Sequence, residues 1–173
     1  MSALVPRNQT PALFDVIVDE NVMVEMRDGV RLATDIYRPA RDGVAMPGVQ
    51  PVLLNRTPYN KVDSEQVNGF NRWFAERGYI AAIQDCRGCY RSEGDVDFLY
   101  PEAEDGYDTM MWLKQQPWAS AKVGLWGTSW SGWTQTALAA LGPDNLGAMI
   151  PNVSGANGYT NSIRHGGALE LRF

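Results

Sequence analysis

The chain has 173 residues, of which 45% are hydrophobic and 20% are charged, and its formal net charge at pH 7 is −5. This length and composition fit one globular domain and exclude a disordered or fibrous chain. The negative charge argues against a nucleic-acid partner, which would require clustered Lys and Arg. No stretch approaches the roughly 18 apolar residues of a membrane span, and the N-terminus lacks the features of an export signal. We therefore expect a cytoplasmic protein with a small-molecule partner, whose oligomeric state the sequence leaves open.

Apolar runs alternate with helical patterns along the chain. A hairpin is expected over 21–38, because apolar residues alternate on both sides of Asp28-Gly29, a pair that tolerates the positive φ angles of a type I′ turn. Continuous apolar runs predict buried strands at 51–56, 79–85, 122–127 and 146–153. Helical spacing predicts helices at 66–76, 102–115 and 131–141. Buried strands that alternate with helices indicate the α/β class, with a parallel sheet covered on both faces.

The segment GLWGTSWSGW, residues 124–133, places two serines between a predicted strand and a predicted helix. In a nucleophile elbow the serine occupies a sharp turn from strand to helix and needs small residues two positions before and after it. Ser129 has Gly127 and Ser131 at these positions, whereas Ser131 is followed two positions later by the bulky Trp133. The alternative is that Ser129 only caps the following helix, since serine is a preferred N-cap residue. The context of strand, turn and helix favours Ser129 as a nucleophile.

Five motifs follow one another along the chain: MRDGVRLATDIYRP (26–39), PVLLNRTPYNK (51–61), RGCYRSEG (87–94), GTSWSG (127–132) and HGGAL (165–169). Together they resemble the cocaine esterase and glutaryl-acylase group of α/β-hydrolases, which are relatives of the X-Pro dipeptidyl peptidases. The resemblance covers nearly the whole chain. It implies the N-terminal portion of an α/β-hydrolase fold, a mostly parallel sheet flanked by helices that stops before the later strands. Residues 1–154 would belong to the catalytic domain and residues 155–173 to the start of a helical cap.

By this resemblance, Ser129 is the nucleophile of a serine hydrolase, and the backbone N–H of Trp130 is one donor of the oxyanion hole. Tyr59 corresponds to a tyrosine whose hydroxyl is the second donor, and its alternative role is that of a half-buried loop aromatic behind Pro58. Trp130 and Trp133 are candidates for the wall of the acyl pocket, or for plain core. The implied substrate is a small-molecule ester or amide, and no cofactor or metal ion is implied.

A serine nucleophile needs a base and an orienting carboxylate, which in this fold follow it as Asp or Glu and then His. The sole histidine is His165, in a segment that resembles the passage into the cap, and the only acid between it and Ser129 is Asp144. Asp144 follows a helix that leads away from the serine at about 1.5 Å per residue, so we expect the two to lie about 15 Å apart. The triad acid and base are therefore expected outside this chain, and the 173 residues alone are expected to be inactive.

Two further hypotheses stay open beside an esterase or acylase. One is an X-Pro dipeptidyl peptidase, whose amine-recognising acids have no counterpart that the sequence identifies. The other is a non-catalytic chain that keeps a half-sheet for binding or assembly. This second hypothesis predicts a stable product of 173 residues, although an incomplete sheet would expose an apolar edge.

The two cysteines, Cys86 and Cys89, form a CxxC motif. A zinc site would need two more ligands from a chain with one histidine, and a thioredoxin-like pair would lie at a helix N-terminus. This pair instead follows an apolar run and enters a Gly-rich loop. We interpret the cysteines as incidental thiols, with a labile disulfide as the open alternative.

Overall fold

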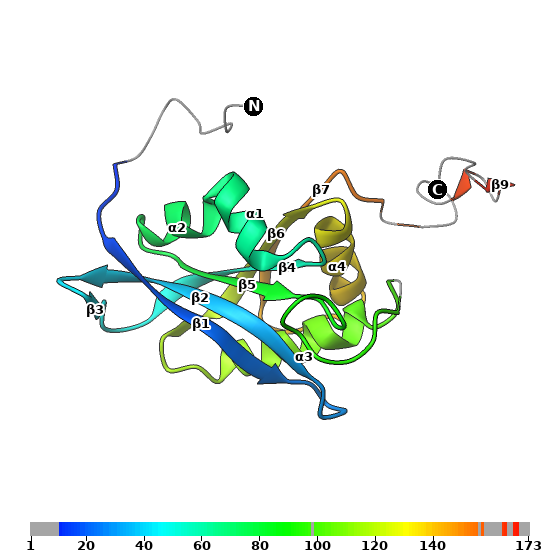
Figure 1. Ribbon diagram of the computed structural model, residues 1–173, viewed down its shortest axis with the longest axis horizontal. Coiled ribbons are helices and arrows are strands. Elements are labelled where there is room, and N and C mark those ends of the chain that lie inside the picture. The colour runs from blue at the N-terminus through cyan, green and yellow to red at the C-terminus, as the bar shows by residue number, and fades with distance from the viewer. Residues whose placement is uncertain (1–10, 98, 156, 158–163, 166–167, 170–173) are drawn as a thin grey trace.

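The computed structural model describes residues 11–97, 99–155, 157, 164–165 and 168–169, and for residues 66–68, 165 and 169 it describes the backbone only. A single mixed sheet lies at its centre, with the strand order β1-β2-β5-β4-β6-β7 and β3 paired to β2 (Figure 1). The strands are β1 (Asp15–Glu25), β2 (Arg31–Arg41), β3 (Val44–Ala45), β4 (Gln50–Thr57), β5 (Ile80–Asp85), β6 (Ala119–Thr128) and β7 (Leu146–Asn152). The four strands from β5 to β7 are parallel, and the pairs that involve β2 are antiparallel. The predicted α/β class is confirmed.

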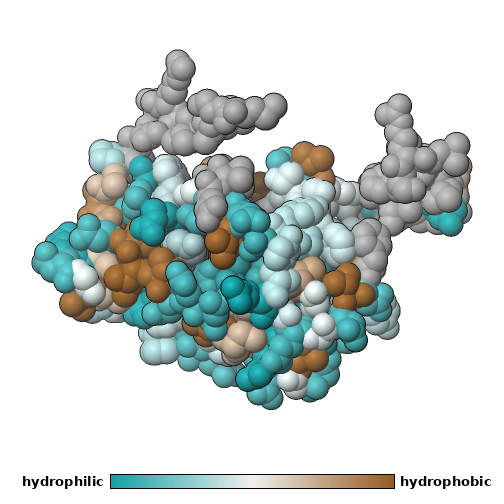
Figure 2. Space-filling model, viewed as in Figure 1, coloured by the Kyte–Doolittle hydropathy of each residue, from teal (hydrophilic) through white to brown (hydrophobic). Residues whose placement is uncertain are grey.

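Helices cover both faces of this sheet (Figure 1). On one face, α1 (Lys61–Asn68) and α2 (Phe70–Ala75) pack against β5 and β2, and on the other, α3 (Glu102–Lys114) and α4 (Trp130–Ala139) pack against β6 and β7 and against each other. Side chains of a strand alternate between the faces, so Leu54 of β4 joins the core beneath α3 and α4 while Leu53 points to the α2 side. The face of the molecule seen in Figure 2 is mainly hydrophilic, with hydrophobic side chains in several separate patches.

The hairpin is confirmed, but its turn differs from the prediction. Its strands are longer, and residues 26–30 form the loop, in which the N–H of Met26 donates to the carbonyl of Val30 at 2.8 Å. Gly29 has a φ of 85°, whereas Asp28 is not among the residues with positive φ, so the turn is not type I′. The Asp28 carboxylate instead accepts hydrogen bonds from the N–H of Val30 and from Arg87. These contacts stabilise the longer loop.

The helix predicted over 66–76 is wrong in its boundaries, because two helices occupy this region. α1 begins earlier, where the side chain of Asn60 accepts a hydrogen bond from the N–H of Val62 at the N-terminus of the helix. It ends at Gly69, which has a φ of 60° and donates its N–H to the carbonyl of Glu65. A left-handed glycine terminates a helix, so α2 starts separately after it.

The strand β7 forms one edge of the sheet and matches the predicted fourth strand. Beyond it, the loop expected from residue 155 contains a pair of two-residue strands, β8 (Arg164–His165) and β9 (Ala168–Leu169). Most of the predicted cap segment lies outside the described residues. Within the part of the chain that the structure describes, no helix is long and apolar enough to cross a membrane.

Candidate active site

Ser129 occupies the turn between β6 and α4, with a φ of 61° and a ψ of −121°. This conformation is costly for any residue with a side chain, and such strain is characteristic of functional sites. Ser129 lies at the N-cap position of α4, but its side chain makes no capping hydrogen bond. Its N–H donates to the carbonyl of Asn152 in β7 at 3.0 Å. The hydroxyl is therefore available at an exposed position and is not used as a helix cap.

Two glycines allow α4 to pack closely against the sheet at this turn. A Cβ at Gly127 would lie 2.6 Å from the Cβ of Ser131, and a Cβ at Gly132 would lie 2.6 Å from the Cβ of Ser154. Real Cβ atoms do not approach this closely, so the turn requires glycine at both positions. Ser131 itself is buried, which leaves Ser129 as the exposed serine of the motif.

Tyr59 reaches Ser129 from the loop that follows β4. Its hydroxyl donates to the Oγ of Ser129 at 3.2 Å, and the backbone N–H of Trp130 donates to the same tyrosine hydroxyl at 3.4 Å. The structure thus brings together the three groups that the sequence analysis named: the serine hydroxyl, the tyrosine hydroxyl and the backbone N–H after the serine. A carbonyl oxygen placed beside Ser129 would meet two hydrogen-bond donors.

A buried ion pair fixes the loop that carries Tyr59. The Nζ of Lys61 lies 2.9 Å from Oδ1 of Asp35 and also donates to the side chain of Asn21, and both charged side chains are at most 6% exposed. The backbone N–H of Lys61 donates to the carboxylate of Asp85 at 2.8 Å. Burial raises the pKa of this Asp85 carboxyl, while the N–H donors and Lys61 oppose the shift. The loop is thereby tied to β2 and to the end of β5.

A second buried network lies beneath the elbow, on the α3 side of the sheet. The indole Nε1 of Trp130 donates to Oε1 of Glu102 at 2.8 Å, and Oε2 of the same carboxylate lies 2.9 Å from Nη1 of Arg56. Both charged side chains are at most 3% exposed. Burial alone would lower the pKa of Arg56, but the carboxylates of Glu102 and Asp105 oppose this, and the pKa is raised above its ordinary value. Sequence reasoning missed this network; its only signal was an arginine ending an apolar strand.

A cavity of about 350 Å³ lies beside Ser129 on the α1 and α2 side of the sheet. It is lined by Tyr59 and the turn around Ser129, and also by residues of β4, α1 and α2. Neither Trp130 nor Trp133 lines it: the Trp130 indole binds Glu102, and the Nε1 of Trp133 is buried without a hydrogen-bond partner.

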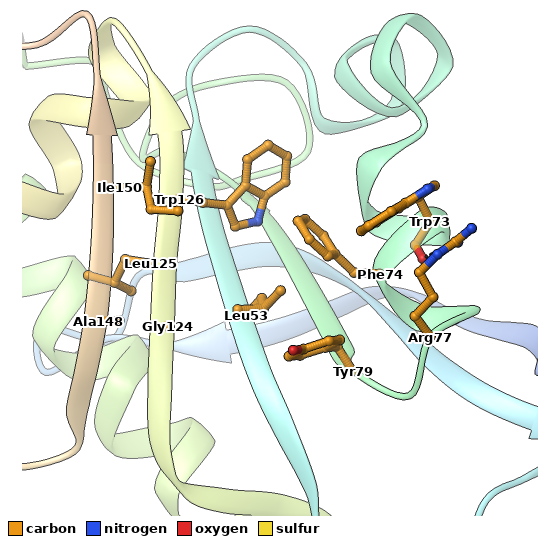
Figure 3. A pocket seen from close by; sticks show the side chains of 10 residues that line it. All are labelled: Leu53, Trp73, Phe74, Arg77, Tyr79, Gly124, Leu125, Trp126, Ala148 and Ile150. Atoms are coloured by element: carbon orange, nitrogen blue, oxygen red, sulfur yellow. Dashed lines mark hydrogen bonds between the residues drawn. The ribbon is translucent and has the colours of Figure 1, made fainter. Parts of the chain in front are cut away.

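An apolar cavity of about 470 Å³ continues along the same sheet face toward the amino ends of the strands. Figure 3 shows Trp126 pointing from β6 toward Phe74 of α2, with Leu53 and Tyr79 farther along this face. The rings of Trp126 and Phe74 lie 5.7 Å apart. Trp126 lines both cavities, so it lies where the region beside Ser129 and the apolar region meet.

Asp144 lies away from the elbow. It occupies the turn between α4 and β7, where its carboxylate accepts a hydrogen bond from Lys114 at 2.7 Å. β7 starts at Leu146, which pairs with Val123 in β6, so Asp144 is near the amino ends of these parallel strands while Ser129 follows the carboxyl end of β6. The backbone of His165 belongs to β8, and its side chain lies outside the described residues.

Cys86 and Cys89 are both free thiols, the first buried and the second half-buried. Burial raises the pKa of both thiols, and the nearby Glu102 carboxylate raises them further. Among the described residues there is no group of three or more His, Cys, Asp or Glu side chains that could hold a metal ion.

Comparison with known proteins assigns the chain to a family. Residues 28–173 match the model of the X-Pro dipeptidyl-peptidase (S15) family. The chain is 41% identical to cocaine esterase of Rhodococcus sp. (strain MB1 Bresler) over 160 residues, which are 89% of this chain and 27% of the esterase.

Solved structures agree with this assignment. An α-amino acid ester hydrolase is 30% identical with a TM-score of 0.70, and the match covers 93% of this chain and 30% of the hydrolase. A CocE/NonD family hydrolase from Staphylococcus aureus is 27% identical with a TM-score of 0.74, covering 90% of this chain and 31% of that one. The chain thus spans about a third or less of these relatives, and its sheet is that of an α/β-hydrolase. It belongs to the X-Pro dipeptidyl-peptidase (S15) family, together with the CocE/NonD-like hydrolases.

Proposed function

We propose that this chain carries the nucleophile and the oxyanion hole of a serine hydrolase that cleaves an ester through an acyl-enzyme. The observation that carries the proposal is the contact of the Tyr59 hydroxyl with both the Oγ of Ser129 and the N–H of Trp130. Strain at Ser129, its exposed position and its lack of a capping bond support the same role.

In the proposed reaction, the Oγ of Ser129 attacks the substrate carbonyl carbon while a base accepts the hydroxyl proton. The carbonyl oxygen becomes an oxyanion that accepts hydrogen bonds from the Tyr59 hydroxyl and the Trp130 N–H. Collapse of this intermediate expels the alcohol, which takes up the proton from the base, and leaves an acyl-serine that water then hydrolyses. The cavity beside Ser129 supplies space for one side of the substrate.

The base and its carboxylate are proposed to come from residues outside these 173. Asp144 is bound to Lys114 near the opposite end of the strands. The only histidine, His165, lies in the segment that resembles the passage into the cap. In this proposal, residues 1–154 contribute to the catalytic domain and residues 155–173 lead into a cap. Without a base, oxyanion donors alone give weak residual activity, so the 173-residue chain by itself is expected to turn over little or no ester.

The substrate class is proposed from the relatives. Cocaine esterase and the α-amino acid ester hydrolase are both named for ester substrates, which favours an ester over an amide. Dipeptidyl-peptidase activity is the second candidate, because the matching family model bears that name. Turnover of a p-nitrophenyl ester compared with an X-Pro-p-nitroanilide distinguishes the two.

The decisive test is active-site labelling of the full-length gene product that contains this chain. A fluorophosphonate probe is expected to label Ser129, and the Ser129→Ala variant to lose both labelling and ester turnover. Ser131→Ala is the matched control, since it removes the neighbouring buried hydroxyl and leaves the proposed nucleophile in place. Undiminished turnover by Ser129→Ala would contradict the proposed function.

A further inference from the structure

One carboxylate links the two sides of the proposed oxyanion hole. Oε1 of Glu102 accepts the indole N–H of Trp130, the residue whose backbone N–H is one donor. Oε2 and the backbone carbonyl of Glu102 both contact Nη1 of Arg56, which lies three residues before Tyr59, the other donor. We propose that Glu102 is a positioning residue that sets the distance between the Trp130 N–H and the Tyr59 hydroxyl. This inference rests on the proposed function of Ser129.

On the Trp130 side, the bond from the indole to Glu102 restrains the backbone N–H of the same residue. Trp130 is the first residue of α4, and its Cα carries both the indole and the backbone N–H that points to the Tyr59 hydroxyl at 3.4 Å. A ring fixed at its far end by a buried acceptor restrains the rotation of that residue. The N–H follows the strained Ser129, and the bond from the ring to Glu102 adds a restraint on its direction to that of the helix backbone.

The Arg56 side acts through the end of β4. The guanidinium is 2% exposed and donates to Gln84 in β5 at 2.8 Å and to the carbonyl of Glu102 at 2.8 Å. Arg56 is thereby fixed between β5 and the first residue of α3. The segment from Arg56 to Tyr59 therefore begins at a residue that the Glu102 carboxylate helps to hold in place.

The close packing of α3 supports this role. A Cβ at Gly106 would lie 3.3 Å from Nη1 of Arg56 and 3.2 Å from the Cβ of Leu138, so α3 and α4 approach each other around the guanidinium. The helix that begins with Glu102 therefore has little freedom to shift. A carboxylate held on such an element can fix its two partners more precisely than one on a loop.

The test compares variants of the full-length protein by kcat, KM and inhibition by a boronic acid that forms a tetrahedral adduct with Ser129. Trp130→Phe keeps the backbone N–H and most of the ring but removes the bond to Glu102. Complete loss of one oxyanion donor lowers kcat by about 100-fold or more, so a displaced donor is expected to lower it by roughly tenfold. Boronate affinity is expected to fall by a similar factor while KM changes little, since the donors act on the tetrahedral state.

Glu102→Gln keeps an oxygen for the indole, and Glu102→Leu removes it. We expect Glu102→Gln to retain more of kcat than Glu102→Leu, and Glu102→Leu combined with Trp130→Phe to be no worse than Glu102→Leu alone. Because an unpaired Arg56 can prevent folding, Trp130→Phe, which leaves the ion pair intact, decides the question by itself if the Glu102 variants do not fold.

Trp118→Phe is the matched control, because this indole packs against Trp112 beside the start of β6, away from the elbow. Wild-type kcat and boronate affinity in Trp130→Phe, as in Trp118→Phe, would overturn the inference even if the melting temperature fell. The Ser129→Ala variant distinguishes a failure of the positioning role from a failure of the proposed function. If it is inactive while Trp130→Phe is normal, only the positioning role fails; if it stays active, the proposed function fails.

Discussion

The hydroxyl of Tyr59 donates a hydrogen bond of 3.2 Å to the Oγ of Ser129, although the two residues are 70 positions apart in the sequence. Their proximity follows from the topology, because β4 and β6 are parallel neighbours and each residue lies just beyond the carboxyl end of its strand. The carboxyl ends of parallel strands are where open α/β sheets bind ligands. The contact between Tyr59 and Ser129 therefore depends on the order of the strands in the sheet as well as on the two motifs.

The first prediction concerns the tyrosine hydroxyl. Tyr59→Phe removes one of two donors to the oxyanion and keeps the ring, so we expect kcat for an ester to fall by about 100- to 1,000-fold with little change in KM. Steady-state kinetics of the full-length protein measure this. Tyr79→Phe, in the apolar cavity, is the control. An unchanged kcat in Tyr59→Phe would assign Tyr59 to the loop structure alone.

The second prediction uses the strain at the elbow. Alanine at position 129 keeps a Cβ at a φ of 61° and a ψ of −121°, whereas glycine adopts this conformation without strain. Strain of this kind costs about 1–3 kcal/mol, and glycine loses about 0.5–1 kcal/mol more in conformational entropy on folding than alanine. We expect Ser129→Gly to be more stable than Ser129→Ala by about 1 kcal/mol in urea unfolding. Equal stability of the two variants would show that the turn is relaxed.

The strands and the elbow could be predicted from local patterns. Continuous apolar runs located β4, β5, β6 and β7, and the small residues around Ser129 distinguished it from Ser131. These features depend on neighbouring residues, and their physical causes are burial on both faces of the sheet and steric limits at a tight turn.

The networks around the site could not be predicted in the same way. The bond from Arg56 to Glu102 spans 46 positions and that from Lys61 to Asp35 spans 26, so nothing local marks these residues as partners. Only the folded sheet brings them together. Likewise, helical spacing alone did not reveal that Gly69 separates two helices, because the signal there is a backbone angle.

The third prediction concerns the buried pair beneath the Tyr59 loop. Lys61→Met removes the cation and leaves the Asp35 carboxylate buried without its charge partner, which costs about 3–5 kcal/mol. We expect a large loss of stability in urea unfolding and a lower kcat, because Lys61 lies two residues from Tyr59. Adding Asp35→Leu to Lys61→Met is expected to restore part of the stability. A double variant as unstable as the sum of the singles would contradict the coupling.

The fourth prediction concerns the pH dependence of stability. Burial raises the pKa of Asp85 in the folded protein, so the folded state holds this proton more firmly than the unfolded chain. Its contribution to stability is therefore fully present below the unfolded pKa of about 3.9 and is lost as the pH rises through the folded pKa.

Asp85→Asn keeps an oxygen that can accept the N–H of Lys61 and removes the titration. We expect the stability of this variant, relative to the parent protein, to increase as the pH rises from about 4 to 7. Urea unfolding across this range measures the difference. A constant difference between the two proteins would mean that Asp85 titrates alike in both states.

The fifth prediction concerns the two thiols. Cys86 is 2% exposed, and burial together with the Glu102 carboxylate raises the pKa of its thiol well above the ordinary value. Because the thiolate is the reactive form, we expect Cys86 to resist iodoacetamide at pH 8 in the folded protein and to react only after unfolding in urea. Cys89, half-buried with a less perturbed pKa, is expected to react first but more slowly than a free thiol. Mass spectrometry of the time course, with Cys89→Ser as the control, locates each adduct; rapid modification of Cys86 in the folded protein would show that β5 opens at its end.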